Sequence, residues 1–499
     1  MRRVLKLALA AALVAVACRG DNAVLPTPAP TSIQAGGTLR VAVPAEITTL
    51  DPWNADAASI LATRQIYETL VVIDPTTGLA APGLATTWQM SNDGASWTFA
   101  LRHGITLHDG TPFDAVAVVA SFERGRGTPA YAGLFDRQPA ISSVVAIDAS
   151  TVRFELRAPY GPFLAHLAAP ATAIAHGTAG TGAFVAAQDA LAPDGTLTLR
   201  RNETYWRTAQ AGRSLPYLDG LVLRPVRDAA TRLAELRGGR ADLAVDLPVP
   251  QAVTARSDPN LMLVVRPNAS LTSLGVDVTK APFDRAEVRR AIAMSIDRTA
   301  LNNMYFGLSR TASQVVPPAM LGYDESVVEF SPLDVNGAKR VLVDTRVVTP
   351  ISADLAYPSL ATAAYPDPQR VAQSVAADLT KLGIVARLRA VDPAAMATSG
   401  ATFALETTAI GLDPDDVFSP LFAAGEGSTS LVPGLLAKAR AESDASKRSE
   451  LYKQVSKIGR AEVPRVPLLF VDRASAASAR VTGFTADPNA SFGTLWLRP

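Results

Sequence analysis

The hydrophobic residues of this chain alternate, segment by segment, between the two-residue period of a β-strand and the longer period of an α-helix. In SWTFALRHG (96–104), the side chains of Trp97, Phe99 and Leu101 fall on one face of an extended segment. TVRFELR (151–157) repeats this pattern and predicts a second half-buried strand. Between them, apolar residues recur at helical spacing, at Ala115, Val118, Val119 and Phe122. A chain patterned in this way is predicted to be an α/β protein.

The start and the end of such helices are marked by their own residues. Asp109 and Gly110 form a predicted turn, Thr111 is a candidate N-cap and Pro112 suits a first helical position. In the second half of the chain, Gly383 follows a helical pattern and precedes an alternating one, as expected for the residue just after a helix. The helical positions before it are Val371, Val375 and Leu379. Helix, glycine and strand in succession form a unit of α/β architecture.

Length and charge limit the possible classes of protein. The chain has 499 residues, and a single hydrophobic core stops growing at about 250–300 residues, so we expect two or three lobes. There are 47 basic and 46 acidic residues, a net charge of +1, and no basic stripe. Nothing in this balance favours nucleic acid as a partner. After the first 18 residues, no apolar run approaches the length of a membrane span.

The first residues have the layout of an export signal. A basic start at Arg2, Arg3 and Lys6 precedes an apolar run from Leu7 to Val16, which is shorter than the about 20 residues of a membrane span. The only cysteine of the chain, Cys18, follows directly. Ala-Val-Ala-Cys resembles the lipobox of bacterial lipoproteins, although that family usually has leucine at the position of Ala15. We therefore predict a signal peptide over 1–17 and a diacylglycerol on the Cys18 thiol. The alternative is an ordinary cleaved signal with a chance cysteine.

Residues 18–36 are rich in proline, alanine, threonine and glycine and contain few large apolar residues. Such a segment buries too little surface to offset its chain entropy, so we predict a flexible, lipid-anchored linker. The globular sequence is predicted to begin at Gly37.

Several conspicuous residues are better explained by architecture than by chemistry. His108 and Asp109 are interpreted as part of a turn and a helix cap, and the spacing of His103 and His108 does not suit a zinc site. GTAGTGAF (177–184) lacks the Lys-Ser/Thr ending of a phosphate-binding loop and is predicted to let the backbone pass close to a cleft. Arg289 and Arg290 are expected on a solvated helix face. No metal site and no cofactor is predicted.

A series of segments in a fixed order resembles the family 5 extracellular solute-binding proteins, the substrate receptors of ABC importers for peptides, nickel and related cargo. Each segment is a weak signal, but together they cover nearly the whole chain after the linker. The matching segments are LDP (50–52), IYETLVVID (66–74), GLATTWQMSNDGASWTFALRHGITLHDGTPFDA (83–115), GTGAF (180–184), RNETYW (201–206), APFDRAEVRRAIAMSIDR (281–298), LTKLGI (379–384) and RSELYKQVSKIGRAEVPRVPLLF (448–470).

This resemblance implies a two-lobed, periplasmic-binding-protein-like fold of type II, with an extra subdomain and a central ligand cleft. From the positions of the motifs we place lobe I at 37–66, 173–268 and 482–499, its subdomain at 67–172, and lobe II at 269–481. Closure of such a fold works by hinge motion, because the ligand adds contacts to both lobes at once.

The resemblance also suggests where a ligand is bound. Trp53 and Asn54 follow the LDP turn, Tyr131 lies in the subdomain, and Thr181 lies in the glycine-rich segment. An aromatic side chain in a cleft offers apolar area and a polar tip, but ordinary core packing explains Tyr131 equally well.

The segment TTAIGLDPDDVF (407–418) departs from the peptide-binding relatives, which often have Trp-x-x-Asp-x-x-Asp-Pro here. The alignment puts Thr407 at the tryptophan position and Ile410 at the aspartate that pairs with the ammonium group of the peptide. An isoleucine cannot neutralise a buried ammonium group, which would cost several kcal/mol to leave unpaired. Either Asp413, Asp415 or Asp416 replaces that aspartate, or the cargo lacks a free amino terminus. The second alternative is slightly favoured.

The leading hypothesis is therefore a monomeric, lipid-anchored, extracytoplasmic receptor that captures an oligopeptide-like or other small polar solute and delivers it to an ABC permease. A secreted hydrolase is the rival hypothesis, but no G-x-S-x-G motif is present and the four histidines lie in no recognisable triad. A third hypothesis is a receptor repurposed for signalling. The sequence predicts no catalytic residues, and it leaves the identity of the cargo open.

Overall fold

The computed structural model describes residues 33, 35–135, 141–209, 214–318, 320–327, 333–423, 431–485 and 491–498. The predicted signal peptide, Cys18 and the linker up to residue 32 lie outside these residues. The described residues from 35 onward belong to one compact unit. Among the described residues, no helix is both long enough and apolar enough to cross a bilayer.

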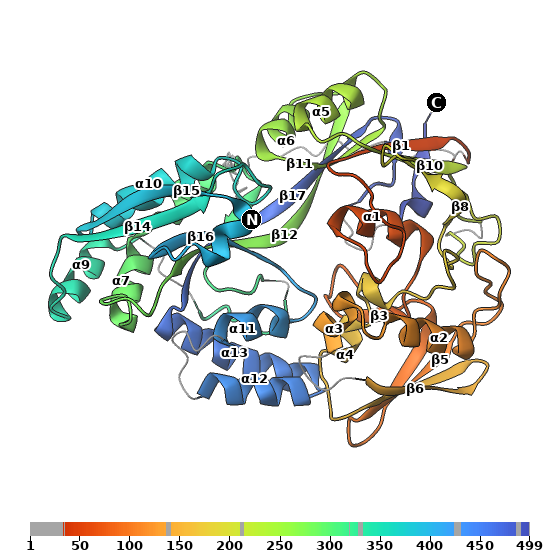
Figure 1. Ribbon diagram of the computed structural model, residues 1–499, viewed down its shortest axis with the longest axis horizontal. Helices are drawn as coiled ribbons and strands as arrows, with labels where there is room; N and C mark the ends of the chain where they lie inside the picture. The colour runs from red at the N-terminus through yellow and green to blue at the C-terminus, as the bar shows by residue number, and fades with distance from the viewer. Residues whose placement is uncertain are drawn as a thin grey trace, which may run out of the picture. The chain divides into compact units, whose positions relative to one another are not determined.

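A mixed sheet of eleven strands organises the described part of the chain (Figure 1). Its strands in spatial order are β15 (Ile384–Val391), β14 (Ile351–Pro358), β16 (Phe403–Ala409), β12 (Leu261–Val276), β17 (Arg465–Ser478), β11 (Leu243–Leu247), β1 (Thr38–Val43), β10 (Gly220–Pro225), β9 (Leu197–Arg201) and β8 (Phe184–Leu191), with β13 (Ser309–Thr311) paired to β17. Parallel and antiparallel pairs both occur, as in β1 with β10 and β12 with β17.

The long strands β12 and β17 connect the two halves of this sheet. One half of their ladder pairs 261–266 with 473–478, and the other pairs 270–275 with 465–471. The register shifts between Arg266 and Ser270. On one side of the shift β17 also pairs with β11, and on the other side β12 pairs with β16. Two antiparallel strands that pass from one half to the other, with an irregularity between them, have the connectivity of a hinge.

The β1–β10–β9–β8 half has its own hydrophobic core. It contains Leu39, Val41, Phe184, Leu221 and residues near the C-terminus such as Phe492. The elements around this half are α1 (Ala57–Ile66), η1 (Pro170–Thr172), α5 (Ala229–Arg237), α6 (Val249–Arg256), the β18–β19 pair (Val481–Thr482 and Trp496–Leu497) and η3 (Phe492–Thr494). The α5 and α6 side chains instead join the core of the other half, through Leu233, Leu236 and Ala252.

Residues 71–166 contain a second sheet with a core of aromatic side chains. Its strands are β4 (Ala85–Met90), β5 (Ser96–Leu101), β7 (Thr151–Leu156) and β6 (Ile141–Asp148), and near them lie the β2–β3 pair (Val71–Ile73 and Ala80–Pro82), α2 (Ala115–Gly125), α3 (Pro129–Phe135) and α4 (Phe163–His166). Phe99, Phe122 and Phe163 surround Phe154 at ring-centroid distances of 5.5, 4.8 and 5.6 Å. The predicted strand 96–101 is confirmed, with Trp97, Phe99 and Leu101 buried.

The predicted start of α2 was three residues too early. The helix begins at Ala115, and its N-cap is Asp114, whose carboxylate accepts a hydrogen bond from the Ala117 amide at 2.9 Å. Thr111 instead lies in the turn before it, where its amide donates to Asp109. Both residue types are good caps, and the apolar face that starts at Ala115 decides between them. Ala115, Val118 and Phe122 are buried, as predicted.

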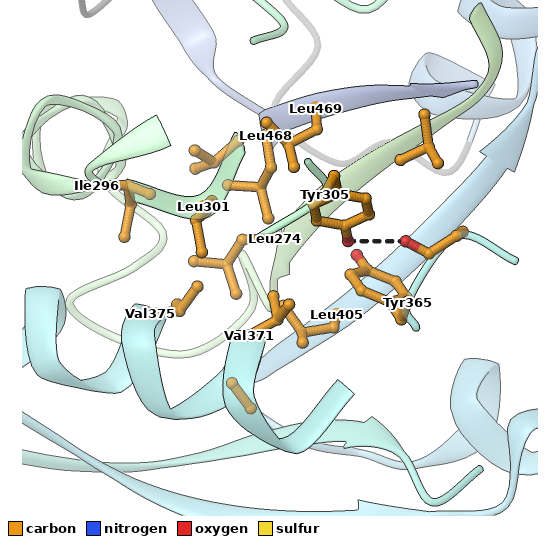
Figure 2. Packing of buried hydrophobic residues seen from close by; sticks show 14 of the residues in the cluster. Leu274, Ile296, Leu301, Tyr305, Tyr365, Val371, Val375, Leu405, Leu468 and Leu469 are labelled. Carbon is orange, nitrogen blue, oxygen red and sulfur yellow. Dashed lines mark hydrogen bonds between the residues drawn. The ribbon is translucent and has the colours of Figure 1, made fainter. Parts of the chain in front are cut away.

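The other half of the main sheet packs against α7 (Ala286–Ser295), α8 (Arg298–Asn303), α9 (Val335–Asp344) and α10 (Pro368–Thr380). Figure 2 shows this core, with Leu274 and Leu405 from the sheet facing Val371 and Val375 from α10. The Tyr305 hydroxyl reaches into it and donates to the carbonyl oxygen of Ala364 at 2.8 Å (Figure 2). The predicted inward face of α10 is therefore confirmed.

The prediction that Arg289 lies on a solvated helix face was wrong. Arg289 is 2% exposed, and its guanidinium donates to the carbonyl oxygens of Glu462, Val463 and Phe283. The Arg289 side chain therefore links α7 to the C-terminal end of α13 (Ala445–Glu462) by hydrogen bonds. Arg290, the next residue, is exposed as expected.

A separate cluster of helices lies beyond this half of the sheet. α11 (Pro414–Ala423), α12 (Leu431–Ala441) and α13 share a core that includes Phe418 and Tyr452, whose rings stack with centroids 5.8 Å apart. The structure also contains η2 (Pro393–Thr398). This cluster places the segment 407–418 beside the end of β16, where the sequence suggested ligand contacts.

Candidate ligand-binding site

A cavity of about 650 Å³ opens where β12, β16 and β17 come together. Its walls come from β16, from the loops near Thr362 and Met396, from α11 and from the middle of β17. Ligand pockets of known proteins have volumes of about 300–1,000 Å³ and combine apolar walls with a few polar groups. The cavity therefore has the size for a small peptide or a solute of similar mass.

Several charged side chains line the cavity, and each is matched by an opposite charge. Glu406 on β16 forms an ion pair with Arg465 on β17. Asp472 accepts from Arg310 at 3.4 Å, and the guanidinium of Arg473 lies 3.7 Å from the carboxylate of Asp246. The sequence analysis missed Glu406, Arg465 and Arg473. The available signal was a charged residue within an otherwise apolar strand, as in LLFVDRAS (468–475).

Of the predicted ligand residues, Thr407 lines this cavity directly. It is exposed on β16, opposite Thr272 of β12. Ile410, three residues later, packs against a small core of Leu271, Ala312 and Phe470. Ile410 is thus held by apolar contacts and supplies no counter-ion for an ammonium group.

The Asp413 carboxylate belongs to a buried hydrogen-bond network with other residues of the chain. Nη2 of Arg448 lies 2.8 Å from both of its carboxylate oxygens, and the Tyr452 hydroxyl donates to it at 3.1 Å. The two charged side chains are only 4% and 7% exposed. Burial lowers the pKa of Arg448, but Asp413 and Tyr452 outweigh it and hold that pKa above the ordinary value. Asp413 and Arg448 are therefore already partnered with each other within the chain.

Asp415 and Asp416 also have partners within the chain. Asp415 accepts from Nε of Arg440 at 2.8 Å and from the Ser419 hydroxyl at 2.6 Å. Asp416 accepts from the Leu412 and Asp413 amides, and one of its oxygens lies 3.2 Å from Nε2 of His166. Burial raises the pKa of Asp416, but His166 and the two amides lower it by more, so it falls below the ordinary value. Ligand contact by these three aspartates stays a prediction.

The aromatic candidates near the LDP turn are buried. Trp53 is 2% exposed, and the guanidinium carbon of Arg124 lies 4.9 Å from its ring centroid. Tyr131 is 6% exposed and meets Phe122 edge to face. Asn54 is exposed, and its amide nitrogen donates to Asp51 at 2.9 Å. None of these three lines the 650 Å³ cavity, and their contact with a ligand stays a prediction.

Thr181 and the glycines around it pack against the end of α1. The Thr181 hydroxyl donates to Glu68 at 3.0 Å. A Cβ on Gly180 would lie 2.2 Å from the carbonyl oxygen of Ile66, and one on Gly182 would lie 2.6 Å from the carbonyl oxygen of Gln65. The glycine-rich segment therefore does allow close backbone approach, and its neighbour is a helix end.

His108 and Asp109 lie in the turn that the sequence predicted, whereas the cap of the following helix is Asp114. His108 accepts from the Gly180 amide, donates to the Gly182 carbonyl, and so holds the glycine-rich segment in place. Burial lowers its pKa. The Asp109 carboxylate accepts from the Thr111 amide and lies 2.7 Å from Nδ1 of His176. Within the described residues, histidine, cysteine and acidic side chains form no group of three suited to a metal ion.

A second cavity, of about 300 Å³, lies between α1, the β2–β3 pair and residues 483–485 and 491–495. Glu68 occupies its wall and accepts hydrogen bonds from Thr181, Tyr205 and Trp206. The carboxylate oxygens of Glu68 are therefore already engaged by hydrogen bonds within the chain.

Residues near 160 contact the helical cluster of α11, α12 and α13 directly. The Gly161 amide donates to the carbonyl oxygen of Arg440 at 2.6 Å, and His166 meets Asp416 as described above. A Cβ on Gly161 would lie 2.0 Å from the carbonyl oxygen of Glu442. This contact brings together two segments that are far apart in sequence. Residues near 160 precede β12, and residues near 440 lie between β12 and β17.

The chain is similar in sequence and in fold to proteins that are already known. Residues 80–429 match the family model described as bacterial extracellular solute-binding proteins, family 5 Middle. The glutathione-binding protein GsiB of Shigella flexneri is 30% identical over 487 residues, which cover 91% of this chain and 92% of that protein. HbpA2 of Haemophilus parasuis has a TM-score of 0.82 at 24% identity, over 93% of this chain and all of the other. DppA of Helicobacter pylori, in complex with the peptide STSA, has a TM-score of 0.74 at 24% identity, over 93% and 99% of the two chains.

These comparisons confirm the predicted two-lobed α/β fold of periplasmic binding proteins. Two of these related proteins are named for binding. The chain belongs to the bacterial extracellular solute-binding proteins of family 5, and it is the substrate-binding protein of an ABC importer.

Proposed function

We propose that this chain is a lipid-anchored receptor that captures a small, peptide-like solute in the 650 Å³ cavity and presents it, closed, to an ABC permease. The observation that carries the proposal is the position of this cavity, because Arg473 in its wall lies at the register shift where β12 and β17 connect the two halves of the sheet. A solute bound there contacts the hinge itself, so its binding energy is available to favour one relative position of the lobes.

Glutathione is a reasonable first candidate for the cargo, because the curated relatives at 30% identity are glutathione-binding proteins. A tripeptide of that size suits the cavity. Among the predicted ligand residues, we propose that Thr407 contacts the solute, since it is exposed in the cavity wall. The proposed roles of Asp413 and Asp415 are structural, because their charges are satisfied by Arg448 and Arg440.

The proposed lobes follow the predicted boundaries, with lobe I at 37–66, 173–268 and 482–499, the subdomain at 67–172 and lobe II at 269–481. Under this division the contact between Gly161 and Arg440 joins the subdomain to lobe II. We propose that this contact belongs to the closed state.

Calorimetric titration of the purified chain with glutathione, di- and tripeptides, opines and metal chelates tests the proposal. The expected result is saturable binding of one class of solute, together with a decrease in radius of gyration in small-angle X-ray scattering. Absence of binding across the whole panel, with a folded protein, would contradict it.

The proposed anchor at Cys18 is supported by the lipobox-like segment that precedes it. Two or more acyl chains are needed for stable attachment. Labelling of cells with an alkyne-tagged fatty acid is expected to mark the wild-type chain in the membrane fraction, and Cys18→Ser is expected to lose both label and attachment. Equal membrane recovery of the two chains would contradict the anchor.

A further inference from the structure

A buried histidine contacts the helix that forms one wall of the 650 Å³ cavity. His166 is the last residue of α4, and its Nε2 lies 3.2 Å from Oδ1 of Asp416 in α11. The other ring nitrogen, Nδ1, lies 2.8 Å from the Tyr160 hydroxyl. His166 and Tyr160 are only 2% and 3% exposed. Both ring nitrogens are therefore engaged in a contact that is shielded from solvent.

The Asp416 carboxylate connects this histidine to the cavity wall. Its Oδ2 accepts hydrogen bonds from the Leu412 and Asp413 amides, both at 3.1 Å, whereas its Oδ1 faces His166. The two amides belong to the segment between β16 and α11, and both of these elements line the cavity. One carboxylate thus holds the corner of the cavity wall with one oxygen and meets residues 160–166 with the other.

The acidic run 413–416 leaves one aspartate for the histidine to match. The titratable groups beside the pair, among the described residues, are Tyr160, Asp413 with its partner Arg448, and Asp415 with its partner Arg440. Burial first, and then the three aspartates, hold the pKa of Tyr160 well above its ordinary value, so its hydroxyl is neutral. Burial raises the pKa of Asp416, but His166 and the backbone amides outweigh it, so this carboxylate is ionised at neutral pH. No described arginine or lysine lies at ion-pair distance from Asp416, and His166 does.

Protonation changes the charge of His166 without breaking either hydrogen bond. In the neutral ring, Nε2 donates to Asp416 and Nδ1 accepts from Tyr160. In the protonated ring both nitrogens donate, and a phenol oxygen can accept. Burial of the ring opposes the charge, but a charge-assisted hydrogen bond is about twice as strong as a neutral one. An unperturbed histidine titrates near about pH 6.5, so the change of charge falls within the physiological range.

We propose that His166 is a positioning residue for solute capture, whose protonation strengthens the contact with Asp416 and so makes solute binding tighter at acidic pH. The proposal rests on the proposed function, in which the contact between residues near 160 and the helical cluster belongs to the closed state, and it adds regulation by pH. The nearby hydrogen bond from the Gly161 amide to the Arg440 carbonyl oxygen joins two backbone groups and does not titrate. The receptor then retains its solute in an acidic medium and releases it more readily in an alkaline one.

The direction of the pH effect follows from the charges. Because the ion pair needs the protonated ring, the added affinity is complete below about pH 6.5 and is lost as the pH rises above that value. Each unit by which the closed state raises a histidine pKa corresponds to an about tenfold gain in affinity on protonation. We expect the ratio of the affinities at about pH 5.5 and about pH 8 to be about three- to tenfold larger in the wild type than in His166→Gln.

Calorimetric titration of the purified full chain at these two pH values tests the proposal. The probe is glutathione, or the tightest-binding solute of the panel given above if glutathione does not bind. Comparison of variants with the wild type removes any titration of the probe itself. Asp416→Asn keeps an oxygen for the two amides and is expected to lose the pH effect as His166→Gln does. His103→Gln removes an exposed histidine and is expected to keep the pH profile of the wild type.

The outcomes distinguish the inference from the proposed function. Melting temperatures of the solute-free proteins at about pH 8 show which variants are folded, and either His166→Gln or Asp416→Asn suffices for the comparison. If a folded variant of this pair and the wild type share one pH profile, the inference is wrong and the receptor function stands. If no solute binds to the folded wild type, the proposed function fails and the inference with it.

Discussion

Replacing Asp413 by asparagine tests whether this aspartate holds the helical cluster together. The side chains of Asp413 and Arg448 are 4% and 7% exposed, with nitrogen-to-oxygen distances of 2.8 Å. Removing one charge of a buried pair leaves the other uncompensated and costs about 3–5 kcal/mol. Since a folded domain has about 5–15 kcal/mol of stability, the loss should be large in urea unfolding followed by circular dichroism.

Two further variants make the result specific. Glu450→Gln breaks an exposed ion pair with Lys453 on the same helix, α13, and is expected to cost less than about 1 kcal/mol. The double variant Asp413→Leu with Arg448→Met removes both charges and is expected to recover most of the stability lost in Asp413→Asn. An Asp413→Asn protein whose unfolding free energy stays within about 1 kcal/mol of the wild type would refute a structural role. A selective loss of ligand affinity in that stable variant would instead assign Asp413 to the binding site.

Two other predictions concern residues 67–172, the proposed subdomain. Gly161→Ala is expected to weaken solute binding, because its Cβ would lie 2.0 Å from the Glu442 carbonyl oxygen and push residues near 160 away from the helical cluster. Gly434→Ala, at an exposed position of α12 with no atom within 4 Å, is the control and should bind normally. Unchanged affinity in Gly161→Ala would remove this contact from the closed state. The turn at Asp109 should give a pH-dependent contribution to stability, since hydrogen bonds from His176 and Thr111 outweigh burial and lower the pKa of Asp109 to about 2. That contribution is complete above the unfolded pKa of about 3.8 and is lost as the pH falls to about 2, so wild type and Asp109→Asn should differ in unfolding free energy at pH 5 and converge near pH 2.

The spacing of apolar residues within a single segment was enough to predict the elements that bury one apolar face. The alternating residues of β5 and the inward face of α10 are examples, because each needs only one apolar side. The cap of α2 was misplaced between two good capping residues, Thr111 and Asp114, that lie three positions apart. Arg289 could not be placed from local pattern, because two of its carbonyl partners, Glu462 and Val463, lie more than 170 residues away along the chain.

The ordered family motifs predicted the two-lobed fold and the solute-binding function, which periodicity alone did not. The chemistry of the cavity was harder to predict. Arg473 of the cavity wall lies opposite Arg266, 207 positions earlier in the sequence, only because β12 and β17 pair. Similarly, the acidic run 413–416 suggested free carboxylates, whereas Arg440 and Arg448, from helices later in the chain, neutralise two of them.

Native mass spectrometry of the purified chain most directly tests whether the cavity at the hinge captures a solute. Wild-type protein incubated with the solute panel is expected to carry one small-molecule adduct per chain. Thr407→Trp, which fills the cavity from the exposed face of β16, is expected to lose that adduct while keeping its melting temperature. An adduct that persists at full occupancy in Thr407→Trp, or a folded wild type that carries none from any solute, would contradict capture at this site.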